Sequence, residues 1–473
     1  MTTGRALAGL IAVSSAIRLA FAGAIGLGVD ESYMVASGRV LAWGYFDHPP
    51  LAWWMLELAW NDSAIAVRLP FIVLFAVSTW LMFRLTATLY DERAGLWAAL
   101  AFNLSPVFGV SAASWVLPDG PMICGLLIMA LCLVRGLEKP NAADWIGVGV
   151  GAGLALLSKY TAVLPIFGVL VYLIAIPRHR RLLRGPYPWL ALVVAIEVFS
   201  PVLIWNASHN WISFAFQGGR AGGARFNSLG PLTVLAGEAL FVLPWIWLPM
   251  MLVLWTALRR GDWRGRLLAC MAVGPIILFV VLALWSPRVL FHWAAAGYLF
   301  LFPLLGVWLA ARQPRLLAGA TAAVLVSAAV AAVVVLRVNP WPLPKDPGLQ
   351  ALDWTPLRAA MAERGLLGHR IAAPNWSDAG KIDYALGGDP AVICLNIDAR
   401  QYLFAPAPAV GDDLLIIAPR QSEARIRADY AGVFGAIEAL PPLVFALPGR
   451  PSVSFGLFLG HRLNRSFPAL QNR

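Results

Sequence analysis

The stretch that decides the fold class is LLAGATAAVLVSAAVAAVVVLR, residues 316–337. It contains no charged residue before Arg337, and a helix of this length crosses the hydrocarbon core of a bilayer, which is about 30 Å thick. Further runs along the chain share this character. The pattern therefore predicts an α-helical polytopic membrane protein with about 11 transmembrane helices. The predicted spans are 6–27, 64–85, 94–116, 121–137, 145–158, 162–176, 189–205, 231–257, 267–285, 297–311 and 316–337.

The composition excludes the soluble classes of protein. Of 473 residues, 60% are hydrophobic and only 13% are charged, whereas soluble domains carry roughly 25% charged residues. This excludes a cytosolic enzyme, a disordered scaffold and a fibrous protein. The net charge of +11 would suggest a nucleic-acid partner for a soluble protein. Here no nucleic acid is expected, because basic residues collect in the cytoplasmic loops of membrane proteins.

The loops between the predicted spans differ in charge, and this difference predicts an orientation. Alternate loops carry most of the basic residues, and the positive-inside rule places those loops in the cytoplasm. We therefore expect a multi-pass protein of the inner (plasma) membrane with a cytoplasmic N-terminus and an extracytoplasmic C-terminal tail. The basic loops contain Arg5, Arg84, Arg93, Arg135, Lys139, Arg178, Arg180, Arg181, Arg184, Arg259, Arg260, Arg264, Arg266, Arg312 and Arg315.

The chain changes character after Asn339-Pro340-Trp341-Pro342, a Pro-rich stretch that is typical of a linker. We therefore expect a transmembrane domain over 1–338 and a small extracytoplasmic α/β domain over 339–473. The elements predicted for this second domain are an amphipathic helix over 353–365 and buried strands over 391–395 and 414–418.

The first predicted outer loop, residues 28–63, is unusually rich in acids and aromatic residues. It begins with Asp30-Glu31 and continues with Gly44-Tyr45-Phe46-Asp47-His48-Pro49-Pro50. Its aromatic residues suit short helices that lie at the membrane interface. Two interpretations of Asp30-Glu31 stay open: the acids stabilise the start of a following helix, or they take part in chemistry.

Other predicted outer loops carry charges that a plain connector does not need. Asp119 either caps the next helix or is functional. Lys159, between two short apolar runs, either binds an anionic partner or reaches lipid phosphate. Arg220 belongs to a Gly-rich loop, 206–230, which either closes over a ligand or is an ordinary surface loop. Arg288 lies on the same predicted side.

These residues together predict chemistry on a phosphorylated lipid. Carboxylates supply a general base or hold a metal, and Asp30, Asp47 and His48 are the candidate ligands if a divalent metal is present. No cofactor is required by the sequence. Cations bind phosphate, and arginine is best suited to forked contacts. Acids and phosphate-binding cations on one side of a membrane suit such a reaction.

The same residues carry a family resemblance. The first loop resembles that of polytopic glycosyltransferases of the family 39 type, which include protein O-mannosyltransferases, the aminoarabinose transferases acting on lipid A, and related lipopolysaccharide sugar transferases. The resemblance covers roughly residues 5–310. The motifs that carry it are Asp30-Glu31-Ser32-Tyr33, Gly44–Pro50, Arg68-Leu69-Pro70, Pro118-Asp119, Ser158-Lys159-Tyr160-Thr161, Pro201–Asn206 and Trp211–Arg220.

The resemblance implies a GT-C fold and a donor that is a sugar on a polyprenyl phosphate. It also implies that Asp30 matches the acidic residue of the family's active site. Asp47-His48 aligns with a pair that in aminoarabinose transferases is an acid and a lysine, and the lysine contacts the donor phosphate. Histidine is only partly charged near neutral pH, and this departure argues against a close aminoarabinose homologue.

The sequence therefore predicts a membrane glycosyltransferase that moves a hexosyl or pentosyl unit from a polyprenyl-phosphate donor to an extracytoplasmic lipid, glycan or protein acceptor. The alternative is a transporter or flippase of lipid-linked glycans, for which Glu197 and Glu238 would be the intramembrane acids. Membrane lipids are the other expected partners. The predicted roles are catalytic for Asp30, Glu31 and Asp119, donor-phosphate binding for Lys159, Arg220 and His48, and supporting for Asp47, Tyr45 and Arg288.

Overall fold

The computed structural model describes residues 2–220, 222, 226–338 and 347–465. Its contacts divide the chain into two units. Unit 1 comprises residues 1–20, 42–59 and 68–325, and unit 2 comprises residues 21–41, 60–67 and 326–473. The predicted linker at 339–342 and the domain boundary beside it lie outside the described residues, so the division into domains at 338/339 stays a prediction.

Helices form at every predicted span, and the chain is a multi-pass membrane protein. Among the described residues, 7 helices are long and apolar enough to cross a membrane, or up to 9 if each of two bent pairs counts as one span. The helices up to residue 338, apart from α2 of unit 2, are α1 (Thr3–Ala24), α3 (Leu51–Trp54), η1 (Met55–Leu58), α4 (Ala64–Leu89), α5 (Glu92–Leu104), η2 (Val107–Ala112), α6 (Asp119–Glu138), α7 (Ala142–Leu156), η3 (Tyr160–Ala162), α8 (Val163–Ala175), α9 (Pro177–Arg180), η4 (Arg181–Arg184), α10 (Tyr187–Ser208), α11 (Ile212–Arg220), α12 (Gly230–Val242), α13 (Pro244–Arg260), α14 (Trp263–Leu282), α15 (Ala295–Tyr298), η5 (Leu299–Leu301), α16 (Phe302–Arg312) and α17 (Arg315–Val338).

One predicted span is a broken helix. Residues 231–257 were expected to cross as one run, but α12 and α13 meet at an angle of 112°. The break falls at Leu243, whose backbone has φ 84°, and Pro244 follows it. Proline has no N–H to donate and cannot continue the preceding helix. Hydropathy along the sequence does not register this break, because both arms are apolar.

Arg18 is buried in unit 1, although it lies within the apolar helix α1. Its Nε donates to the Gly109 carbonyl at 2.9 Å and its Nη2 to Asn103 Oδ1 at 2.9 Å. The Gly109 carbonyl belongs to η2, a short π-helix, and such turns leave backbone carbonyls available. The guanidinium also lies over the Phe75 ring, 4.7 Å from its centroid. These contacts supply the partners that a cation in a membrane span requires.

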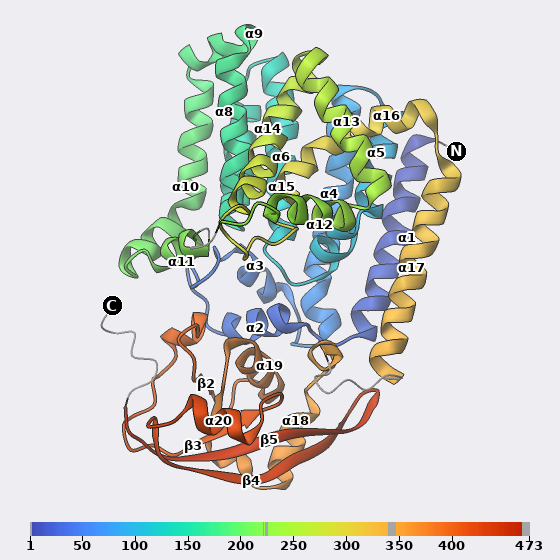
Figure 1. Ribbon diagram of the computed structural model, residues 1–473. Helices are drawn as coiled ribbons and strands as arrows, with labels where there is room; N and C mark the ends of the chain where they lie inside the picture. Colours follow the sequence, from blue (N-terminus) through green and yellow to red (C-terminus); the bar gives the residue numbers. More distant parts are fainter. Residues whose placement is uncertain (1, 221, 223–225, 339–346, 466–473) are drawn as a thin grey trace. The chain divides into compact units, whose positions relative to one another are not determined.

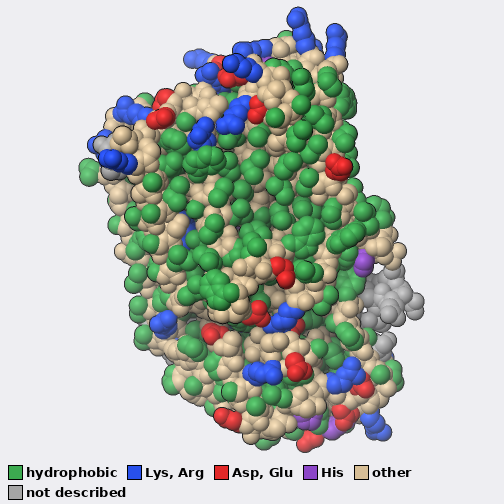
Figure 2. Space-filling model, turned by 180° about the vertical axis from the view of Figure 1, so that it is seen from behind, with side chains coloured by type: hydrophobic (Ala, Val, Ile, Leu, Met, Phe, Trp, Pro, Cys, Tyr) green, Lys and Arg blue, Asp and Glu red, His purple; other side chains and the backbone are tan. Residues whose placement is uncertain are grey.

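The surface of the helices matches a membrane environment. On the face seen in Figure 2, hydrophobic side chains cover the helices, and Lys and Arg side chains gather at one end of them. Arg178, Arg180, Arg181 and Arg184, in α9 and η4, are exposed. They belong to the loops for which the positive-inside rule predicts a cytoplasmic position.

Unit 2 holds the α/β part of the chain. Its sheet has the order β2-β1-β3-β5-β4, with β1 parallel to β2 and β3, and β5 antiparallel to β3 and β4. Figure 1 shows β4 and β5 as a long twisted pair of strands. The elements are α2 (Val29–Gly38), η6 (Pro347–Ala351), α18 (Pro356–Glu363), η7 (Leu366–Gly368), β1 (Arg370–Ala373), α19 (Trp376–Leu386), β2 (Val392–Cys394), η8 (Arg400–Phe404), β3 (Leu414–Ala418), α20 (Glu423–Asp429), β4 (Phe434–Leu447) and β5 (Arg450–Leu463).

The short apolar runs of the tail form one edge strand, β2, and the central strand, β3, of this sheet. The predicted strands at 391–395 and 414–418 are confirmed as β2 and β3, in which every residue is buried. The predicted helix at 353–365 is confirmed in shorter form as α18. Continuous apolar runs are typical of parallel strands, because helices cover both faces of such a sheet.

Candidate active site

The centre of the candidate site is an ion pair within unit 1. The ammonium of Lys159 contacts both carboxylate oxygens of Asp119 at 2.8 Å. Asp119 is the first residue of α6, and Lys159 follows α7 in an extended conformation just before η3. Both residues are buried, with exposed fractions of 9% and 7%. The helix N-terminus favours a carboxylate at this position, so the capping interpretation of Asp119 and the functional one are compatible.

His292 lies within electrostatic range of this pair. Burial is the main cause that lowers the pKa of His292 to about 4, and the positive charges of Lys159 and Arg220 lower it further, against the opposing effect of Asp119. The imidazole is therefore neutral at pH 7 and offers a hydrogen-bonding group without charge. The charges of Lys159, Asp119 and Arg220 thus all act on this histidine, and the charge of His48 acts on Asp119.

Arg220 ends α11 and lies against aromatic rings. Its guanidinium carbon is 4.6 Å from the centroid of the Trp293 ring and 5.8 Å from that of Phe216. Its carbonyl accepts a hydrogen bond from Ser286 Oγ at 3.0 Å. Stacking of this kind orients the planar guanidinium. Within the Gly-rich segment predicted as a loop over 206–230, residues 212–220 form the helix α11, and residues 221 and 223–225 lie outside the described part of the chain.

The second half of the first loop is held firmly in unit 1. The Tyr45 ring stacks on Trp53 with centroids 4.2 Å apart, and the Tyr45 N–H donates to the His48 carbonyl at 3.2 Å. Burial raises the pKa of Tyr45 to about 12. The hydrogen bond to the Ala42 backbone lowers this pKa and the Glu57 charge raises it, each by less than burial does. The phenol of Tyr45 therefore stays neutral. The Asp47 carbonyl accepts from the Gln217 amide.

A backbone contact joins this loop to the segment that carries the lysine. The Leu51 N–H donates to the Leu157 carbonyl at 3.0 Å, two residues before Lys159. Asp119, Lys159, Arg220 and His48 thus all belong to unit 1, and their roles in the reaction stay predictions. Arg288 belongs to the same unit but is exposed, and its backbone N–H donates to Ser286 Oγ at 3.3 Å.

Asp30 and Glu31 belong to unit 2, in the first turn of α2. Glu31 Oε2 accepts from the Gly28 N–H at 2.8 Å, and Glu31 is 3% exposed. This contact is the helix-capping role that the sequence left open for the acid pair. Asp30 is exposed. Its role as the catalytic carboxylate stays a prediction from the first-loop motif.

Sequence reasoning missed His292 and its neighbour Trp293. Both lie between α14 and α15, in the predicted outer loop that also holds Arg288. The signal was available, because a histidine and a tryptophan in a short outer loop are the kind of residues singled out in the other loops. Sequence reasoning also did not pair Tyr160 with Ser213, whose hydroxyls lie 2.7 Å apart.

Within the described residues, no group of three or more His, Cys, Asp or Glu side chains is arranged to hold a metal ion. Asp47 and His48, two of the three residues named as candidate metal ligands, belong to unit 1, and Asp30 belongs to unit 2. We therefore assign no step of the reaction to a metal.

The known proteins that this chain resembles in sequence are all glycosyltransferases by name. Residues 47–205 match the family described as dolichyl-phosphate-mannose-protein mannosyltransferase. The chain is 24% identical over 292 residues to lipid A galacturonosyltransferase RgtD of Rhizobium johnstonii, a match that covers 59% of this chain and 60% of that protein. It is 26% identical over 207 residues to lipopolysaccharide core galacturonosyltransferase RgtB of the same organism, over 42% of this chain and 41% of that protein. The chain thus spans 60% or less of the length of these relatives.

A solved structure shows the same fold over nearly the whole chain. ArnT from Cupriavidus metallidurans, bound to undecaprenyl phosphate, aligns with a TM-score of 0.63 and 15% identity, over 97% of this chain and 98% of that one. The apo form of the same protein aligns with a TM-score of 0.62. The chain therefore has the GT-C fold, and its resemblance to polytopic GT-C glycosyltransferases is confirmed.

Proposed function

We propose that this chain is a membrane glycosyltransferase that moves a hexosyl or pentosyl unit from a polyprenyl-phosphate donor to an extracytoplasmic lipid, glycan or protein acceptor. The observation that carries the proposal is the buried Asp119–Lys159 pair, with Arg220 and His292 around it, in a chain with the GT-C fold. The undecaprenyl phosphate bound in the ArnT structure supports a polyprenyl-phosphate donor. The name of one relative, a lipid A galacturonosyltransferase, supports a lipid acceptor.

The reaction is a displacement at the anomeric carbon of the sugar. The acceptor hydroxyl oxygen forms a bond to that carbon while the bond from the carbon to the donor phosphate oxygen breaks. The hydroxyl proton passes to the carboxylate of Asp30, the proposed general base. The electron pair of the broken bond stays on the phosphate, which leaves as a polyprenyl phosphate monoester with one more negative charge.

The cations of unit 1 suit the developing charge on the leaving group. Lys159 and Arg220 both act on His292 electrostatically, which supports the proposal that they act on one phosphate. Positive charge placed in advance, in a site that excludes water, stabilises a transition state more than it stabilises the ground state. Asp119 fixes the Lys159 ammonium and partly neutralises it, and the stacked rings orient Arg220. Neutral His292 adds a hydrogen-bonding group without further charge.

The decisive test compares the surface glycolipids and glycoproteins of a deletion strain with those of the parent strain by mass spectrometry. We expect one glycolipid or glycoprotein to lose the mass of a single sugar residue and the polyprenyl-phosphate sugar to accumulate. A plasmid that carries the wild-type gene should restore the lost mass. Purified protein in lipid nanodiscs must also transfer the sugar in the absence of any other enzyme. Movement of intact donor across vesicles without transfer would instead support the flippase alternative.

The predicted orientation is testable with cysteine labelling. Gly218→Cys in α11 and Ile397→Cys in unit 2, both exposed sites, should react with a membrane-impermeant thiol reagent applied to whole spheroplasts. Arg181→Cys should react only after the membrane is permeabilised. The wild-type protein is the control, since its own cysteines are buried or partly buried. Labelling of Arg181→Cys from outside would reverse the topology.

A further inference from the structure

The acid-bearing helix α2 is built into unit 2, although it lies more than three hundred residues before the sheet in sequence. It packs closely on α19. A Cβ atom added to Gly380 of α19 would lie 2.8 Å from Tyr33 Cα, so the two helices approach backbone to backbone. The Tyr33 ring lies edge-on to Trp376 with centroids 5.4 Å apart, and Tyr33 Oη accepts from the Gln401 N–H at 3.1 Å.

The turn before α2 lies against a second segment of unit 2. A Cβ atom added to Gly26 would lie 2.4 Å from the Asp353 nitrogen and 2.5 Å from the Leu352 carbonyl carbon. The chain at 26–27 therefore runs in direct backbone contact with 352–353, and any side chain at residue 26 would separate them.

Lys381 bridges these two segments. Its Nζ donates to the Leu27 carbonyl at 2.8 Å and to the Leu352 carbonyl at 2.7 Å, and it lies over the Trp354 ring, 5.1 Å from the centroid. The residue is only 1% exposed. Burial of an ammonium group is costly unless hydrogen bonds compensate it. An apolar side chain could fill this position without the desolvation cost of an ammonium group. We therefore attribute the presence of lysine here to the two backbone carbonyls that it holds.

The fixed backbone is the one that presents Asp30. The Leu27 carbonyl also accepts from Ser32 Oγ at 3.4 Å, and the next residue, Gly28, is bonded to Glu31 through its N–H and to the Ser32 N–H through its carbonyl. The hydrogen bond from Lys381 to the Leu27 carbonyl therefore ties down a turn that is also hydrogen-bonded to the first turn of α2. Movement of this turn would move the first turn of the helix, which contains Asp30.

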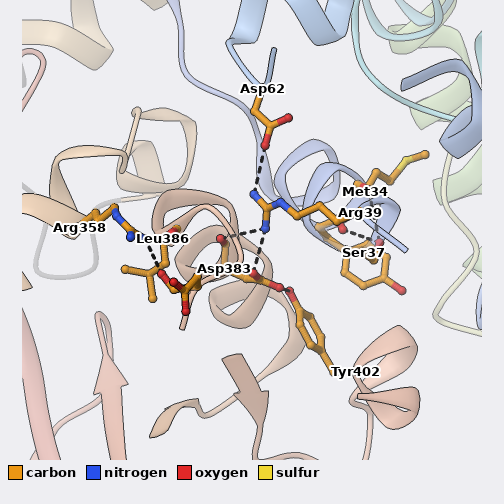
Figure 3. Close-up of polar contacts among 10 residues, drawn as sticks. Met34, Ser37, Arg39, Asp62, Arg358, Asp383, Leu386 and Tyr402 are labelled. Atoms are coloured by element: carbon orange, nitrogen blue, oxygen red, sulfur yellow. Dashed lines mark hydrogen bonds and ion pairs between the residues drawn. The ribbon is translucent and has the colours of Figure 1, made fainter. Parts of the chain in front are cut away.

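Arg39 holds the other end of α2. As Figure 3 shows, its guanidinium lies between Asp383 of α19 and Asp62. Nη1 donates to Asp383 Oδ1 at 3.0 Å and to the Asp383 carbonyl at 3.2 Å, and Nη2 donates to Asp62 Oδ2 at 3.3 Å. Tyr402 Oη donates to the other Asp383 oxygen at 3.1 Å. Both ends of α2 are thus tied to α19.

We propose that Lys381 is a positioning residue for the transfer reaction, which fixes the turn at Leu27 and thereby the orientation of Asp30, with Arg39 as a second positioning residue. This inference rests on the proposed function, in which Asp30 is the general base. The C-terminal part of the chain would then contribute to catalysis through Asp30, without itself contacting the substrate.

The test uses the full chain in nanodiscs and the variant Lys381→Met, which removes both hydrogen bonds and keeps most of the volume. We expect kcat per folded molecule to fall by about 100-fold, the loss typical of a reacting group displaced by about 1 Å. The KM for the donor should change by less than about threefold, because donor binding is not altered. The matched control is Arg364→Met. It removes an exposed cation that also donates to two carbonyls, those of Pro441 and Pro442, and should leave kcat unchanged.

A double-mutant cycle separates positioning from general destabilisation. If Lys381 acts through Asp30, then Lys381→Met should lower the residual activity of Asp30→Asn by less than about twofold. An equal loss in both backgrounds, or full activity of Lys381→Met beside an inactive Asp30→Asn, would overturn the inference and leave the proposed function standing. Retained activity of Asp30→Asn alone would overturn the base assignment, whatever Lys381→Met does.

Arg39→Gln covers the case in which Lys381→Met does not fold, as judged by size-exclusion chromatography and thermal unfolding. The Arg39 side chain is 24% exposed, so this substitution is milder. We expect kcat to fall by about tenfold with the same absence of further loss in the Asp30→Asn background. Unchanged kcat in a folded Arg39→Gln protein would then overturn the inference.

Discussion

Replacement of Asp30 by asparagine is expected to reduce sugar transfer by about 10²–10⁴-fold while the protein stays folded in the membrane. Asparagine has nearly the same volume as aspartate but cannot accept the proton of the acceptor hydroxyl. The measurement is a single-turnover assay with radiolabelled donor in nanodiscs, which resolves a small residual rate. Donor affinity should be nearly unchanged, because the loss falls on the chemical step.

Two acids of the same loop provide controls for this prediction. Glu57→Gln, at an exposed position of η1, should leave transfer unaltered. Glu31→Gln should cause a far smaller loss than Asp30→Asn, because an amide oxygen can still accept from the Gly28 N–H. Retention of more than about a tenth of the activity by Asp30→Asn would disprove its role as the base.

Removal of Lys159 is expected to affect both stability and donor binding. Lys159→Met leaves the Asp119 carboxylate buried without its ammonium partner, and loss of one member of a buried pair typically costs about 3–5 kcal/mol of unfolding free energy. Loss of a hydrogen bond to the charged phosphate should weaken donor binding by about 1.5–3 kcal/mol, which is roughly a 10- to 150-fold increase in Kd. The measurements are unfolding in detergent and titration of a non-transferable polyprenyl-phosphate analogue.

The double variant Asp119→Leu/Lys159→Met separates these two effects. Replacement of both charges by apolar side chains should recover most of the lost stability, while donor binding stays weak if Lys159 contacts the phosphate. Lys139→Met, at an exposed lysine, is the matched control and should change neither quantity. Recovery of normal donor affinity in the double variant would restrict the pair to a structural role and leave Arg220 as the cation for the phosphate.

The class of the protein and the location of its helices could be predicted from hydropathy alone. Long apolar runs leave only helices as spanning elements, because a bilayer offers no partner for unpaired backbone groups. The strands at 392–394 and 414–418 were equally visible, since their residues are apolar throughout. Individual outer-loop charges such as Asp119 and Lys159 were also evident, because a charge beside an apolar span stands out.

The pairing of these residues, in contrast, became visible only in the folded chain. Asp119 and Lys159 are 40 positions apart, and the packing of α6 on α7 that joins them cannot be read from the local pattern of either segment. Likewise, α2 belongs to unit 2 because Gly380 admits Tyr33 and Lys381 reaches the Leu27 carbonyl. Hydropathy and propensity describe each segment by its neighbours in sequence, whereas these contacts depend on side-chain shape and hydrogen-bond geometry between segments that are 40 to 354 residues apart.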